Sequence, residues 1–336
     1  MHRTLAVVGC IVMMQAVVAA QGTEPIIQPE TGQTHFICPL DGFAFNWPDL
    51  QPSGSNRGID SDMCPYPTGV FPYGQNIVTC PHCNYTDIRT RFATDTLTNP
   101  MKDKLLQVLA GSTYRGVQDS YLMIPTWERC RLGMLCAKAR GLKVSESIDF
   151  PLVAIYSIRF ESTRLASTSQ QFGDPLRDHI YLARVERKMT EAKDPGERAR
   201  LKLELAMLAQ RMGLPQVRER WLTAASADPG ATPALKTAIE NFRAMTKLET
   251  SFQKDMLTLL DEARADTDLA AERRMSLTYL KADTLRRLGD LKQAAQLFHD
   301  LRSTMTEISP RRDMVDYFTA LLRDHLPEQV EEKEKK

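Results

Sequence analysis

The residues most capable of chemistry in this chain are four cysteines in its first quarter, Cys38, Cys64, Cys80 and Cys83. The last two belong to the run Cys80-Pro81-His82-Cys83, in which two thiolates on one tight turn supply half of a tetrahedral zinc shell. Cys38-Pro39 begins a similar turn, but Asp41 stands where a second cysteine would complete it. The sequence therefore predicts a structural zinc site of four thiolates, with Asp41, His35 or His82 as reserve ligands.

Three other chemistries could use the same residues. Disulfides, for instance Cys38 with Cys64 and Cys80 with Cys83, would suit an oxidising compartment. A thiol–disulfide redox protein would use the Cys80–Cys83 pair, although no βαβ pattern follows this motif as in a thioredoxin fold. A metal-assisted hydrolase would use Asp41 in place of a thiolate and keep an open coordination position.

Residues 1–20 have the layout of a secretory signal peptide. His2 and Arg3 give a short basic start, an apolar stretch follows, and Ala19-Ala20 supplies small residues before the expected cleavage point. The apolar stretch is shorter than the ~20 residues of a membrane-spanning helix. We therefore expect export to the periplasm or the extracellular space, with no membrane span after cleavage. Cys10 would leave with the signal, so that six cysteines remain.

The overall composition is that of a soluble globular protein. The chain has 336 residues, 43% of them hydrophobic, and a net charge of +1. This length suggests about two domains. Because the charge is nearly balanced, we expect no nucleic-acid partner, which would require a basic surface.

The texture of the chain changes near residue 99. Residues 21–98 form a head that is rich in turn-forming residues, with short strands expected before Cys38 and Cys80. Because such a head can bury little apolar surface, it needs a stabilising cross-link such as a metal ion or a disulfide. Residues 99–326 have helical periodicity, and helices are expected from Pro125 to Gly141 and after Asp194-Pro195. Residues 327–336 predict a charged, disordered tail.

Two thiols belong to the helical part. Cys130 and Cys136 are six residues apart on the helix expected after Pro125, so they point to different faces. We expect both to be buried free thiols, because cysteine packs as a small hydrophobic residue.

A weak internal repeat runs through the helical part. A helix ends at Gly213 and another at Gly289, and each is followed by a helix with small and aromatic residues, of which Ala294 and Phe298 fit the tetratricopeptide pattern best. The two glycines are further apart than two ~34-residue units. We expect a short α-solenoid with an irregular insert.

The cysteine-bearing segments resemble those of the bacterial "domain of unknown function 2225" family. The resemblance rests on Phe36-Ile37-Cys38-Pro39, on Asp60-Ser61-Asp62-Met63-Cys64-Pro65-Tyr66 and on Val78-Thr79-Cys80-Pro81-His82-Cys83-Asn84-Tyr85. It implies a zinc-ribbon-like head followed by a helical tail like tetratricopeptide repeats, and it implies no activity. Two positions depart from the family pattern, since Asp41 replaces a cysteine and Asn84 replaces a glycine.

No catalytic signature accompanies these features. The sequence contains no Gly-rich phosphate loop, G-x-S-x-G elbow or H-E-x-x-H motif. Asp60 and Asp62 are expected to cap a turn near Cys64, and Arg286 and Arg287 are expected on solvated helix faces. We therefore expect a mainly α protein that is not an enzyme and that offers its helical array to a protein or peptide partner.

Overall fold

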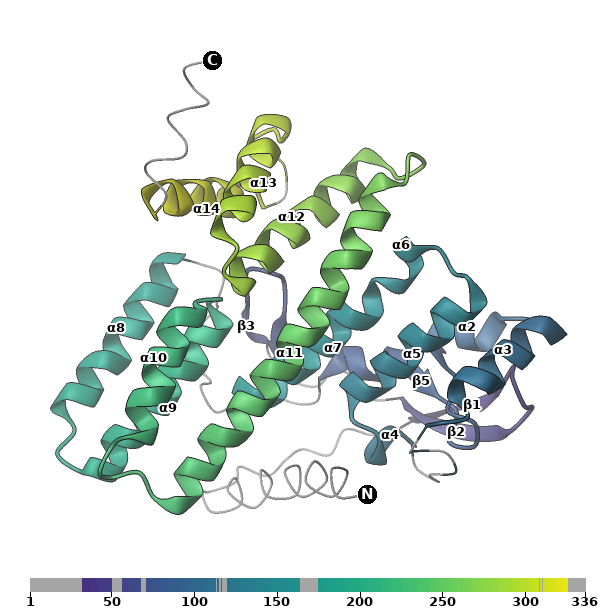
Figure 1. Ribbon diagram of the computed structural model, residues 1–336, viewed down its shortest axis with the longest axis horizontal. Helices are drawn as coiled ribbons and strands as arrows, with labels where there is room; N and C mark the ends of the chain where they lie inside the picture. The colour runs from purple at the N-terminus through teal and green to yellow at the C-terminus, as the bar shows by residue number, and fades with distance from the viewer. Residues whose placement is uncertain are drawn as a thin grey trace.

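Short hairpins at the N-terminus and long helices behind them make up the chain (Figure 1). The computed structural model describes residues 32–49, 56–67, 71–112, 114, 116, 120–163, 175–307, 309 and 311–325. The expected signal peptide and charged tail lie outside the described residues. Within them the architecture is mainly helical, with a small strand-containing head and no closed sheet, as the sequence predicts.

The head consists of three separate antiparallel hairpins. They pair β1 (Gly32–Ile37) with β2 (Ala44–Asp49), β3 (Asn56–Ile59) with β4 (Pro65–Pro67), and β5 (Ile77–Thr79) with β6 (Thr86–Ile88). A 3-10 helix, η1 (Pro72–Asn76), leads into β5. The tip of each hairpin carries one of the three cysteine-bearing segments described in the sequence. The potential ligands therefore lie in turns, and the paired strands hold these turns in place.

Six helices follow the three hairpins. They are α2 (Arg89–Thr94), α3 (Asn99–Leu109), α4 (Ser120–Met123), α5 (Thr126–Arg140), α6 (Val144–Ser147) and α7 (Asp149–Thr163). Helix α5 ends as expected, because Gly141 adopts the left-handed conformation at its C-terminus with φ of 69°. Cys130 and Cys136 are both buried on α5, and they belong to different core clusters, in agreement with the prediction that they point to different faces.

The second half is a series of packed helices. They are α8 (Pro175–Glu191), α9 (Pro195–Arg211), α10 (Pro215–Ser226), α11 (Pro233–Ala265), α12 (Ala271–Leu288), α13 (Leu291–Thr304) and α14 (Arg312–His325). Asp194 begins α9 by accepting a hydrogen bond from the backbone N–H of Glu197 at 2.8 Å. None of the described helices combines the length and the apolar character needed to cross a membrane.

The two expected helix pairs are α9–α10 and α12–α13, and the 33-residue helix α11 runs between them (Figure 1). Helix α11 explains why the repeat spacing exceeds two regular units. In the second pair, Ala294 and Phe298 are fully buried, and the Phe298 ring packs edge-on against Tyr279 of α12 with centroids 5.9 Å apart.

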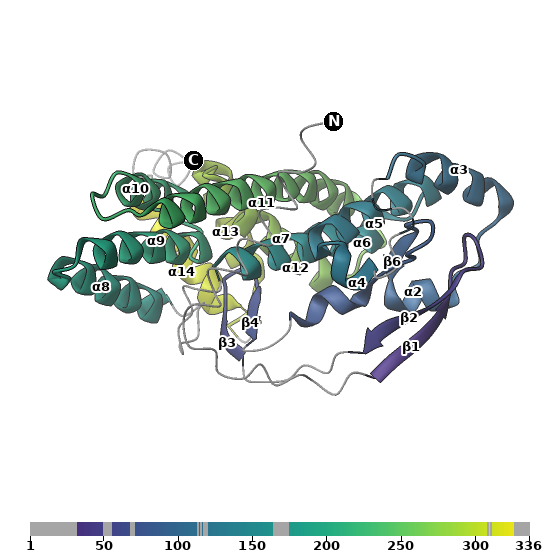
Figure 2. The ribbon, with the colours of Figure 1, turned by 90° about the horizontal axis from the view of Figure 1, so that it is seen from below.

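The head and the helices share their cores. One cluster joins Phe36 and Trp47 of the first hairpin to Leu132 of α5, and another joins Tyr66 of β4 to Phe150 of α7 and Phe252 of α11. Figure 2 shows β1 and β2 at one end of the molecule, whereas β3 and β4 lie near its middle, close to α7 and α12. The helices begin with α2, before the boundary expected near residue 98, and residues on the two sides of that boundary share their cores.

Two glycines with the same backbone conformation have different surroundings. Gly213 and Gly289 both have positive φ, 69° and 88°, so alanine at either position incurs about 1–2 kcal/mol of backbone strain. A Cβ on Gly213 would lie 2.7 Å from Arg287 Cγ, whereas a Cβ on Gly289 would meet nothing within 4 Å.

We predict that Gly213→Ala lowers the free energy of unfolding by about 1–3 kcal/mol more than Gly289→Ala does, because the overpacked side chain of Arg287 is held by hydrogen bonds. Urea denaturation of both variants measures the difference. Equal destabilisation would show that the contact with Arg287 is easily relieved.

Candidate metal centre

The first and third hairpins end in two turns with the same hydrogen-bonding pattern. In the first, the N–H of Cys38 donates to the carbonyl of Phe43 and the N–H of Gly42 donates to the carbonyl of Cys38, both at 2.9 Å. In the third, Cys80 and Tyr85, and then Asn84 and Cys80, make the equivalent bonds, again at 2.9 Å. Counted from the first cysteine of each turn, Asp41 thus occupies the position that Cys83 occupies in the third hairpin.

The residue after the last potential ligand is left-handed in both turns. Gly42 has φ of 75° and Asn84 has φ of 64°. Glycine and, less readily, asparagine are the residues that tolerate this conformation. The asparagine at position 84 therefore preserves the backbone path that glycine provides in the other turn.

The two turns bring four potential ligands together. The sulfurs of Cys38, Cys80 and Cys83 and a carboxylate oxygen of Asp41 all lie within 4.8 Å of one another. The Sγ atoms of Cys38 and Cys83 are 3.6 Å apart. Zinc–sulfur bonds of about 2.3 Å in a tetrahedral shell place sulfurs about 3.8 Å apart. The cluster is therefore of a size and composition that can hold a metal ion.

Asp41 is oriented from both sides. Its Oδ1 accepts a hydrogen bond from the backbone N–H of Phe43 at 3.0 Å, and its Oδ2 accepts one from Nδ1 of His82 at 2.7 Å. Burial by itself would raise the pKa of Asp41, but the hydrogen bonds from His82, from the backbone N–H of Phe43 and from the neighbouring thiols together outweigh burial, and the pKa is lowered. The His82 ring also stacks on Phe43, with centroids 5.3 Å apart. Such supporting contacts keep a carboxylate ionised and aligned for a metal.

The three thiols are buried and share their protons unequally. Hydrogen bonds from Cys38 and then Cys83 lower the pKa of Cys80 to about 4. The hydrogen bond to Cys80 raises the pKa of Cys38, and the one to Cys38 raises that of Cys83. Since metal ligands must be deprotonated, an ion binding here would displace the remaining protons.

Cys64 lies elsewhere, which changes the predicted set of four thiolates. Its Sγ is 3.9 Å from the carbonyl oxygen of Tyr156, and its side chain is fully buried in the core cluster around α7. The second hairpin packs into the helical body, and it takes Cys64 with it. Asp41, a reserve ligand in the sequence analysis, stands in the fourth position. His35, another reserve, contacts Asn46 across the β1–β2 hairpin.

None of the six described cysteines forms a disulfide. Cys64 belongs to one core cluster and Cys38 to another, so the Cys38–Cys64 disulfide considered from the sequence has no counterpart in this arrangement.

The tip of the second hairpin, Asp60 to Cys64, carries a different kind of site. Four arginines and four carboxylates, each at most 6% exposed, meet around it; we call them the ionic hub. Its members are Asp60, Asp62, Arg159, Arg211, Glu249, Asp283, Arg286 and Arg287. With four charges of each sign the hub is electrically balanced, which is the condition under which buried charges are tolerated.

Arg159 of α7 is at the centre of the hub. Its Nη1 is 2.7 Å from Asp62 Oδ2 and 3.1 Å from Asp60 Oδ2, and its Nη2 is 2.7 Å from Glu249 Oε1 on α11. One guanidinium therefore ties the hairpin tip to two helices that are distant in the sequence.

Ser61 joins the tip to α12. Its Oγ donates to Asp283 Oδ1 at 3.0 Å and accepts from Nη2 of Arg287 at 2.8 Å, while its carbonyl accepts from the hydroxyl of Tyr279 at 2.7 Å. Burial would raise the pKa of Asp283, but the positive charges of Arg286 and then Arg287, together with their hydrogen bonds, hold it well below its usual range. The tip thus contributes a hydroxyl and a carbonyl as well as charges.

Arg286 and Arg287 also complete the C-terminus of α9. Arg286 Nη1 donates to the carbonyls of Met212 and Gly213, both at 3.0 Å, and Arg287 Nη1 donates to that of Arg211 at 3.1 Å. These carbonyls have no partner within their own helix, and cations at a helix C-terminus are favourable. The expectation that the two arginines lie on solvated faces is therefore wrong.

Asp60 and Asp62 have a larger structural role than the turn capping expected from the sequence. Asp62 does cap the turn, since its Oδ1 accepts from the backbone N–H of Cys64 at 3.3 Å. Its ion pair with Arg159 joins residues 97 positions apart, and no local pattern reports such a contact. The sequence signal that remained was the placement of two acids and a serine in one turn.

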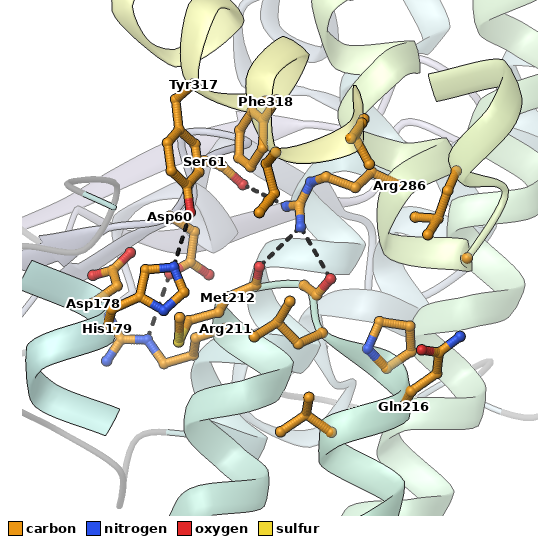
Figure 3. A pocket seen from close by; sticks show the side chains of 18 of the residues that line it. Asp60, Ser61, Asp178, His179, Arg211, Met212, Gln216, Arg286, Tyr317 and Phe318 are labelled. Atoms are coloured by element: carbon orange, nitrogen blue, oxygen red, sulfur yellow. Dashed lines mark hydrogen bonds and ion pairs between the residues drawn. The ribbon is translucent and has the colours of Figure 1, made fainter. Parts of the chain in front are cut away.

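A cavity of about 440 Å³ opens beside the hub, and residues of α8, α9, α10, α12, α13 and α14 line it (Figure 3). Ser61 and Arg286 lie along one side, and His179 of α8 is hydrogen-bonded to the Tyr317 hydroxyl of α14 at 2.9 Å. The five N–H groups of Arg286 all contact acceptors in the protein. The guanidinium of Arg286 on this wall is therefore committed to the fold.

No family model, curated protein or solved structure matches the chain. The resemblance to the domain of unknown function 2225 family consequently stays a prediction from the motifs.

We predict that Arg159→Ala lowers the free energy of unfolding by about 3–5 kcal/mol, because it leaves buried carboxylates without their cation. Arg187→Ala is the control, since Arg187 and Glu191 form an exposed pair 3.9 Å apart, for which we expect about 0.5 kcal/mol or less. Urea denaturation measures the free energy of unfolding of both variants. An equally small effect of Arg159→Ala would show that the ion pairs of Arg159 are not needed for stability.

Proposed function

We propose that the chain is an exported, non-enzymatic interaction protein with a zinc-stapled head and a helical body that binds a protein or peptide partner. The observation that carries the zinc assignment is the convergence of three cysteines and one aspartate from two equivalent turns. Thiolates favour zinc over magnesium or calcium, which prefer oxygen ligands.

A structural role for the zinc agrees with the number of ligands. Three sulfurs and one carboxylate oxygen fill a tetrahedral shell, and a closed shell has no position for a reacting water. The short hairpins around the site pair only within themselves, so a metal joining two tips would supply cohesion that the strands do not.

A role in partner binding agrees with the helical body. Stacked helix pairs expose long faces and grooves, and this architecture commonly serves recognition. Export is supported by the composition of residues 1–20, which contain a basic start, an apolar stretch and small residues.

A thiol–disulfide activity of Cys80 and Cys83 is the second candidate, favoured by the pKa of Cys80, which is lowered to about 4. A reactive cysteine needs access to its substrate as well as a low pKa. Cys80 and Cys83 are at most 2% exposed, and a third thiol adjoins them. Insulin reduction that is lost in Cys80→Ser would establish this activity and overturn the non-enzymatic proposal.

We predict that the purified chain binds one equivalent of zinc and that Cys38→Ala abolishes binding. Asp41→Ala should weaken zinc affinity at least about tenfold, because even supporting residues of a zinc site contribute this much. Zinc content by elemental analysis and affinity by competition with a chromophoric chelator are the measurements.

Cys64→Ala is the matched control, because it removes an equally buried thiol outside the cluster. We expect it to retain a full equivalent of zinc. If Cys64→Ala loses zinc as Cys38→Ala does, the assignment of Asp41 as the fourth ligand is incorrect.

A further inference from the structure

A groove between α10 and α11 carries a concentration of positive charge. It encloses about 670 Å³, and the charged residues that line it are Arg218, Glu219, Arg243, Lys247 and Lys254. Four cations and one anion give this single groove a charge of +3, whereas the whole chain has +1. The groove therefore attracts anions locally although the protein as a whole does not.

The cations on α11 form a stripe. Arg243, Lys247 and Lys254 are four and seven residues apart, so they share one face of the helix. At 1.5 Å per residue the stripe is about 16 Å long. An extended peptide rises about 3.3 Å per residue, so roughly five residues would lie along it.

The groove already holds one carboxylate in the manner proposed for a ligand. Arg243 Nη2 is 3.2 Å from Glu219 Oε1, with both side chains partly exposed. Lys247 and Lys254 form no ion pair with any residue in the described part of the chain. The two lysines are thus open to an incoming anion, and Arg243 is paired with the carboxylate of Glu219, which an anionic ligand can replace.

Arg218 is held in position from the hub. Its Nη1 donates to Oε1 of Gln210 at 2.6 Å, and the amide of Gln210 in turn donates to Glu249. The guanidinium of Arg218 is consequently fixed at the wall of the groove before any ligand arrives. A fixed cation loses less conformational freedom on binding than a mobile one.

We propose that this groove binds an acidic peptide segment of about five residues in the partner protein. This inference rests on the proposed function and specifies its partner. Grooves for single-stranded nucleic acid add aromatic side chains on which bases stack, and membrane-binding helices add an apolar face. The residues that line this groove include no aromatic side chain and no exposed apolar one. The only apolar residue lining the groove, Leu222, is fully buried, so the recognition is electrostatic.

The test is binding of a fluorescein-labelled penta-glutamate peptide to the full chain, followed by anisotropy at low salt. We expect Lys247→Gln/Lys254→Gln to weaken the affinity about fivefold, since each exposed ion pair contributes modestly. Glu219→Gln should strengthen it about twofold by releasing Arg243. Lys236→Gln, an exposed lysine of α11 that does not line the groove, should have no effect.

Three results would overturn the assignment. They are no binding of the peptide, equal loss in the Lys236 variant, and equal or tighter binding of a single-stranded oligonucleotide or of phosphatidylserine vesicles. Cross-linking of the full chain to a partner in cells tests the proposed function separately. If the double lysine variant cross-links a partner as efficiently as the unmodified chain does, the proposed interaction role is supported and the assignment of the groove as the binding site is incorrect.

Discussion

The structure depends on the neutral burial of eight charges around one hairpin tip. Arg159 contacts Asp60, Asp62 and Glu249, so it joins the N-terminal head to α7 and α11 in a single ion cluster. Buried ion pairs contribute little net stability when complete, but an unpaired member is strongly unfavourable. The hub therefore acts as a constraint on arrangement: the carboxylates of the hairpin tip find their cations only when the tip lies against α7, α9 and α12.

The metal cluster and the hub divide the head between two tasks. The first and third hairpins turn their tips toward each other, where Cys38, Asp41, Cys80 and Cys83 gather. The second hairpin leaves them and inserts its tip among the helices, where Ser61 meets Asp283. Cys64 follows the second hairpin, so its proximity in sequence to the other cysteines does not become proximity in space.

Local features of the fold could be predicted from the sequence, and long-range ones could not. The end of α5 at Gly141 and the start of α9 after Asp194 follow from backbone conformation and capping, which depend on a few neighbouring residues. The Cys80–Cys83 turn is similarly local, and so is the equivalence of Asp41. The contact of Ser61 with Asp283 spans 222 residues, and residue type alone made Arg286 and Arg287 resemble ordinary surface charges.

Gln210 connects the hub to the surface of the helical body. Its side-chain nitrogen donates to Glu249 in the hub, and its side-chain oxygen accepts from Arg218 in the groove. Because the amide has separate donor and acceptor ends, one orientation satisfies both neighbours. The same charge balance that positions α9 against α11 therefore also orients a groove cation. One buried amide thus contacts both a carboxylate of the hub and a cation of the groove.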